Sequence, residues 1–85
     1  RMGEIDIIAI KRNTVCFVEV KTRSNANYGH PLESIVTAKK EKIRKTAQYW
    51  LLKHPQYDDI MFLAAAVQMG KNGDILNIDL VEDNF

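Results

Sequence analysis

Two apolar segments near the start of the chain, joined by a short polar stretch, constrain the fold more than any other feature. Residues 4–10 and 15–22 are rich in Ile and Val and flank the polar residues 11–14. Runs of β-branched residues on both sides of a short polar turn are typical of a β-hairpin. We therefore predict two antiparallel strands over 4–10 and 15–22.

The alternation of apolar and charged residues also selects one register for this hairpin. The register that places Asp6 opposite Glu19, and Glu4 opposite Lys21, keeps the charged side chains together on one face, at the end away from the turn. A slip of one residue would mix charged and apolar side chains on both faces. The other face is apolar along its whole length, and we expect it to be core: Ile5, Ile7, Ala9, Cys16, Val18 and Val20.

The middle of the chain has the pattern of an amphipathic helix. Thr37 can cap a helix that runs from Ala38 to about His54, and Pro55 would stop it. Four apolar residues with helical spacing predict a single stripe that faces the core: Ile43, Ala47, Trp50 and Leu51.

The last third of the chain is read as a second hairpin. Residues 60–68 are apolar throughout, so they fit either a buried strand or a short buried helix. A strand is favoured because Asn72-Gly73 supplies a hairpin turn into a segment of alternating apolar and polar residues. The predicted order is β-β-α-β-β, a small α/β domain that occupies residues 1–85.

Length and composition narrow the class of protein. Eighty-five residues allow one domain, and no apolar run is long enough to span a bilayer. The lone cysteine, Cys16, cannot form an internal disulfide, which favours a reducing, cytoplasmic setting.

The charged end of the first hairpin is the candidate site. Directly opposed side chains have Cβ atoms about 4.5–5.5 Å apart, so the carboxylates of Asp6 and Glu19 would almost touch. Such a pair needs a positive partner, and either Lys21 or a divalent cation such as Mg²⁺ or Mn²⁺ fits. Glu4 is a possible further ligand. A purely structural network of ion pairs at the end of a sheet would use the same residues.

Basic residues suggest a second interaction. Lys39, Lys40 and Lys42 crowd the start of the predicted helix, and Arg23 follows the second strand. These side chains could lie along a phosphate backbone, with the planar guanidinium of Arg23 the best suited to a phosphate. A solvated helix face explains the lysines equally well.

Two sequence motifs resemble those of a known family. The segments GEIDIIA (residues 3–9) and FVEVKTR (17–23) are similar to the strand motifs of the YraN-like family of bacterial proteins. The similarity extends over essentially the whole chain, through Tyr28-Gly29, the basic helix start and the closing residues 82–85. The start of the family's next strand differs, because residues 61–63 read Met-Phe-Leu here.

The resemblance implies a fold and an activity. The family is similar to the PD-(D/E)xK, restriction-endonuclease-like superfamily, with a mixed β-sheet, and to Holliday-junction resolvases. By this resemblance we expect Asp6, Glu19 and the carbonyl of Val20 to bind the metal. Lys21 would be the catalytic lysine of the motif. The family's opening helix and first strand have no counterpart here, so we expect an N-terminally truncated domain.

The implied function is a Mg²⁺- or Mn²⁺-dependent endonuclease acting on structured or branched DNA. Two alternatives stay open: a nuclease-like module that binds nucleic acid without cutting it, and a structural subunit that forms a homodimer by pairing of strand edges.

Overall fold

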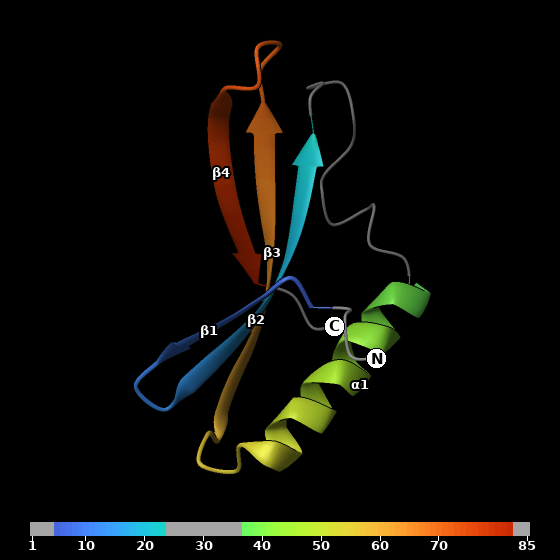
Figure 1. Ribbon diagram of the computed structural model, residues 1–85, viewed down its shortest axis with the longest axis vertical. Helices are drawn as coiled ribbons and strands as arrows, with labels where there is room; N and C mark the ends of the chain where they lie inside the picture. Colours follow the sequence, from blue (N-terminus) through green and yellow to red (C-terminus); the bar gives the residue numbers. More distant parts are fainter. Residues whose placement is uncertain (1–4, 24–36, 83–85) are drawn as a thin grey trace.

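The computed structural model describes residues 5–23 and 37–82, which form one four-stranded sheet and one helix (Figure 1). The elements are β1 (Ile7–Lys11), β2 (Thr14–Arg23), α1 (Thr37–Lys53), β3 (Asp59–Met69) and β4 (Ile75–Glu82). The strands lie side by side in chain order, with β1–β2 and β3–β4 antiparallel and β2–β3 parallel. The predicted β-β-α-β-β order and the α/β class are confirmed. The helix lies in the crossover that the parallel pair requires.

The first hairpin has the predicted register, with Ile7 opposite Val18 and the remaining pairs in step. Its first strand is shorter than predicted, because β1 begins at Ile7 rather than at residue 4. The reason lies one residue earlier. The Asp6 carboxylate accepts a hydrogen bond from the Val20 N–H, 2.8 Å from nitrogen to Oδ2. The Val20 N–H is therefore bonded to a side-chain oxygen instead of a main-chain carbonyl, directly before the first residue of β1.

The helix α1 has bounds within one residue of the prediction. At its C-terminal end the His54 ring nitrogen Nδ1 lies 2.8 Å from the Trp50 carbonyl oxygen, and the two rings stack with their centres 3.9 Å apart. Together with Pro55 just beyond it, this contact ends the helix, since a carbonyl of the last turn gains a partner outside the helix.

The core lies between α1 and the adjoining face of β2 and β3. Phe17 is fully buried at its centre, with ring centres 5.7 Å from Trp50 and 5.5 Å from Phe62. The predicted helical stripe is confirmed, because Ile43 and Ala47 are each 1% exposed and belong to the two core clusters. Burial of these side chains holds the helix to the sheet.

The prediction that the uniformly apolar hairpin face is core along its whole length is confirmed only in part, because Val18 is 7% exposed but Ile7 is 48% exposed. In the described part of the chain the helix covers the opposite face, where Val15 and Phe17 are fully buried, as expected near the turn. Ile5, predicted to pair with Val20 on the uncovered face, instead packs against Ile43 and Ala64 on the helix side. The sequence misleads here because both hairpin faces are apolar near the turn, and only the position of α1 chooses between them.

The second hairpin confirms the choice of strand for residues 60–68. Gly73 adopts φ +83° in the turn, a left-handed conformation that glycine reaches without steric cost. Beyond the turn β4 is exposed along almost its whole length. Its large apolar side chains are between 54% and 65% exposed: Ile75, Leu76, Ile78 and Leu80. Among the described residues there is no helix long and apolar enough to cross a membrane.

Candidate functional site

Asp6 stands at the point where the chain enters β1. Its Oδ2 atom is held by the Val20 N–H, which fixes the carboxylate beside the second strand. This contact also brings the Val20 backbone next to Asp6. Asp6 itself is exposed, so a ligand can reach it from solvent.

Glu19 lies two residues past Phe17 on the face of β2 that α1 covers. Only 4% of Glu19 is exposed. Its Oε2 atom pairs with the Lys39 ammonium of α1 at 3.4 Å, while Oε1 is buried and has no hydrogen-bond partner within the described ranges. A buried carboxylate oxygen without a donor is costly, because it has lost its hydration and gained nothing in return.

The two carboxylates interact directly. Burial raises the pKa of Glu19 above its ordinary 4.5, and the charge of the nearby Asp6 carboxylate raises it further. Lys39 acts in the opposite direction and lowers it. The structure therefore brings together the acidic pair that the hairpin register predicts. The net effect is a pKa of Glu19 above its ordinary value, with burial as the largest cause.

Lys21 does not supply that positive charge. It lies on the same face of β2 as Glu19, opposite Ala66 of β3, and is half-buried. Within residues 5–23 and 37–82 no ion pair joins it to Glu19, and the counter-ion is Lys39 instead. Lys21 is thus two residues from Glu19 along β2 without forming an ion pair with it in the described part of the chain.

The predicted phosphate-binding residues lie in different surroundings. Lys42 is exposed on α1, whereas Lys40 and Arg23 are half-buried. Lys39 differs most from the expectation of a solvated basic face, because its ammonium points to Glu19. Glu4, the possible further ligand, lies outside the described residues.

The pairing of Lys39 with Glu19 is the feature that the sequence did not reveal. The two residues are 20 positions apart, in different elements. The one available signal is the absence of any acidic residue from the first turn of α1. A lysine there opposes the helix dipole and needs a partner elsewhere.

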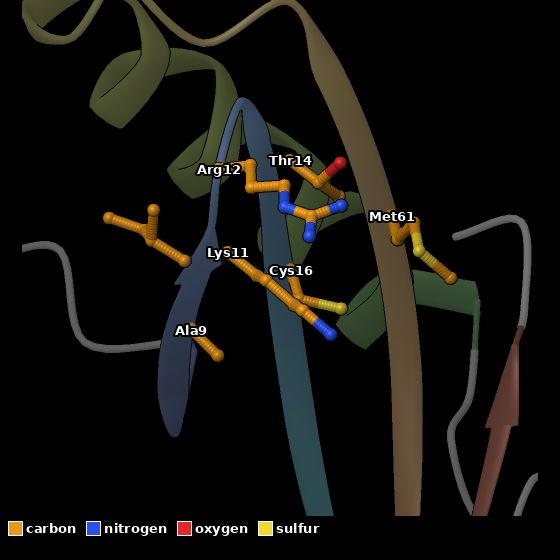
Figure 2. A pocket seen from close by; sticks show the side chains of 7 residues that line it. Ala9, Lys11, Arg12, Thr14, Cys16 and Met61 are labelled. Atoms are coloured by element: carbon orange, nitrogen blue, oxygen red, sulfur yellow. The ribbon is translucent and has the colours of Figure 1, made fainter.

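A cavity of about 500 Å³ lies at the turn end of the first hairpin, apart from the acidic pair. Figure 2 shows the side chains of Lys11, Arg12 and Cys16 pointing toward Met61 of β3. Burial raises the pKa of the Cys16 thiol above 9.0, and the charge of Glu82 adds to the effect. The thiol is therefore neutral at pH 7 and unsuited to act as a nucleophile.

The donor set at Asp6 and Glu19 fits a small, hard cation. No cluster of three or more His, Cys, Asp or Glu side chains that could hold a metal occurs in the described part of the chain. Mg²⁺ does not require one, since it is commonly bound by one or two carboxylates and completes its octahedron with water and substrate phosphate. The unsatisfied Oε1 of Glu19 is the atom such an ion would satisfy.

Comparison with known proteins identifies the family. The family model described as "Uncharacterised protein family UPF0102" matches residues 1–81. A UPF0102 protein of Acetivibrio thermocellus is 42% identical over 89 aligned residues, which cover all of this chain and 68% of that protein. A second, from Caldicellulosiruptor bescii, is 40% identical over 88 residues, covering all of this chain and 73% of the relative. A third, from Chlorobium phaeobacteroides, is 51% identical over 55 residues, or 65% of this chain and 44% of the relative. The chain therefore belongs to the UPF0102 family, which is the YraN-like family that its two strand motifs resemble.

Proposed function

We propose that this protein is a metal-dependent endonuclease that hydrolyses phosphodiester bonds in structured or branched DNA. One observation carries the proposal. The carboxylates of Asp6 and Glu19 lie close together at the end of the first hairpin away from its turn, and one buried oxygen of Glu19 has no hydrogen-bond partner within the described residues. A structural ion-pair network explains this less well, because such a network satisfies its buried oxygens.

Each residue of the site has a distinct role in this proposal. Asp6 and Glu19, with the Val20 carbonyl, hold Mg²⁺ or Mn²⁺, which when bound polarises a phosphoryl oxygen and acidifies a water. Lys21 orients that water or offsets the charge that develops on the phosphate. The hydrogen bond from Val20 N–H keeps the Asp6 carboxylate in place as substrate arrives.

The sheet supports the proposed relation to restriction-endonuclease-like enzymes in one respect. The first hairpin is followed by a helical crossover into a parallel strand, with Glu19 on β2 on the side of α1 and Asp6 directly before β1. The sequence order Asp, then Glu-x-Lys, on two adjacent elements is what the PD-(D/E)xK motif requires. Membership of the UPF0102 family is consistent with this assignment.

Cleavage by the complete protein tests the proposal. Flaps, four-way junctions and single strands are incubated with Mg²⁺ or Mn²⁺, and products are resolved on denaturing gels. We expect cleavage of at least one branched substrate and its loss in Asp6→Asn and Glu19→Gln, both close in size to the original residues. Cleavage that survives in Asp6→Asn, or none on any substrate, would reject the nuclease.

A nuclease-like module that binds nucleic acid without cutting it is the second candidate. The exposed basic residues of α1 favour it: Lys42, Arg44 and Lys45. In that case affinity for DNA falls steeply as salt rises, because each neutralised phosphate releases counterions. Glu19→Gln would leave such binding intact. Binding that does not respond to salt would count against it.

A further inference from the structure

Lys39 occupies an unfavourable position for a lysine. It is the third residue of α1, where the helix dipole places partial positive charge, and Lys40 follows directly. A cation in the first turn is disfavoured by about 0.3–1 kcal/mol. The side chain is nevertheless two-thirds buried, being 32% exposed, with its ammonium 3.4 Å from Oε2 of Glu19. The contact with Glu19 is one interaction that offsets this cost.

The same contact conflicts with a metal ion at the acidic pair. Carboxylate oxygens bind Mg²⁺ at about 2.0–2.1 Å, so an ion on Glu19 would come within a few ångströms of the ammonium. Two cations so close repel strongly at a site screened from water. Glu19 is buried at 4% exposure and cannot turn into solvent to serve both partners. The Lys39 ammonium, at the end of a flexible four-carbon side chain that is 32% exposed, is the part that can move.

We propose that Lys39 is the resident counter-ion of the acidic pair, that a divalent cation displaces its ammonium from Glu19, and that the displaced ammonium then binds a phosphate of the nucleic acid. This inference rests on the proposed function, which it extends by a coupling between the two ligands. Metal binding moves a positive charge from the interior toward the surface of α1. By linkage, nucleic acid then strengthens metal binding by the same factor as metal strengthens nucleic-acid binding.

Metal affinity in a series of variants tests the first half of the proposal. Mn²⁺ binding is measured by titration calorimetry for the wild type, Lys39→Met and Lys39→Arg. We expect Lys39→Met to bind about tenfold tighter, because the ion no longer has to break a charge-assisted hydrogen bond. Lys39→Arg should bind more weakly than the wild type, since a guanidinium pairs with a carboxylate more firmly. Arg keeps the charge, so a decrease reports the pairing and not the net charge.

Lys42→Met is the matched control. It removes the same charge from the same helix at an exposed residue that makes no ion pair with Glu19 within the described ranges. Its Mn²⁺ affinity should equal that of the wild type within about twofold, since solvent and salt screen exposed charges. Circular dichroism verifies that each variant is folded, and Lys39→Arg, which keeps the counter-ion, carries the test if Lys39→Met does not fold.

DNA binding tests the second half. Anisotropy of a labelled branched oligonucleotide is measured in EDTA and in Ca²⁺, a cation used here to fill the site without supporting cleavage. Affinity should rise with Ca²⁺ in the wild type, and this rise should be several-fold smaller in Lys39→Met. Lys42→Met should weaken binding equally under both conditions.

The outcomes separate the two proposals. If neither the wild type nor Lys39→Met binds Mn²⁺, the proposed nuclease site itself is rejected. If the wild type binds Mn²⁺ but Lys39→Met binds no tighter, or Lys39→Arg no weaker, only the displacement of Lys39 is rejected. An equal Ca²⁺ effect on DNA binding in the wild type and in Lys39→Met overturns the proposed phosphate contact.

Discussion

The two hairpins of this sheet differ in what covers them. The strand β2 of the first hairpin lies under α1, with Val15 and Phe17 fully buried. The second hairpin extends away from the helix at its turn end (Figure 1), and Leu80 of β4 is 64% exposed. Each hairpin nevertheless contributes its inner strand to the core, since Ala64 of β3 is 1% exposed, while the edge strands β1 and β4 are exposed along almost their whole length. Hydrophobic content does not determine which strands are covered. The packing of α1 does.

The candidate site lies where the covered region of β2 ends. Phe17 is enclosed by aromatic rings, and two residues later Glu19 is still buried but meets charged groups. A carboxylate there is shielded from water by the core on one side and open to Asp6 on the other. The helix therefore has two functions: it stabilises the fold, and it removes the Glu19 carboxylate from water.

The largest expected effect comes from removing the centre of the covered strand β2. Phe17→Ala should lower the free energy of unfolding by about 3–5 kcal/mol, because a fully buried ring with two aromatic neighbours is lost. Leu80→Ala, on β4, should cost no more than about 0.5 kcal/mol. Urea unfolding followed by circular dichroism measures both. An equal loss of stability in the two variants would show that β2 and β4 are equally packed in solution.

The second effect concerns Glu19 and pH. Because its folded pKa is raised above 4.5, the folded state holds this proton longer than the unfolded state as pH rises. Stability should therefore fall between pH 4.5 and the raised pKa, with a slope of at most about 1.4 kcal/mol per pH unit. Glu19→Gln should remove that fall, whereas Glu41→Gln, at an exposed residue of α1, should keep it. The measurement is urea unfolding from pH 4 to pH 8, and an unchanged profile in Glu19→Gln would contradict the burial of this carboxylate.

A smaller effect is expected in the turn between β3 and β4. Gly73→Ala should cost about 1–2 kcal/mol through backbone strain alone, since φ is +83° and an added Cβ meets no atom within 4 Å. Gly70→Ala is the control in the same turn, because its φ is not positive and its Cβ would make an ordinary contact with Leu76 at 3.4 Å. We expect it to be nearly neutral in the same urea assay. A neutral Gly73→Ala would mean that this turn rearranges readily.

The smallest effect is expected on the exposed face of β4. Ile78→Thr keeps a β-branched side chain at a residue that is already 54% exposed. Stability should change by less than about 0.5 kcal/mol, while solubility should rise because an exposed apolar edge is reduced. Light scattering during concentration measures the second quantity. A loss of stability comparable to that of a core substitution would show that this face is covered in solution.

Much of the fold could be predicted from local patterns. The hairpin register followed from the separation of charged and apolar residues, and the helix from its stripe of Ile43, Ala47, Trp50 and Leu51. The meeting of Asp6 with Glu19 followed from that register, because a pairing of adjacent strands fixes which side chains are neighbours. The late start of β1 at Ile7 could not be foreseen, since it depends on the Asp6 side chain replacing a main-chain acceptor for the Val20 N–H.

The sequence by itself determined the order of elements, the pairing of the first two strands and the proximity of two carboxylates, all of which depend on short-range periodicity. Only the tertiary structure decided which face of the sheet α1 covers, and therefore that Glu19 is buried and that Lys39, not Lys21, neutralises it. The physical reason is that both faces of the first hairpin offer apolar surface. The choice between them is made by packing between segments far apart in the chain, which no local pattern records.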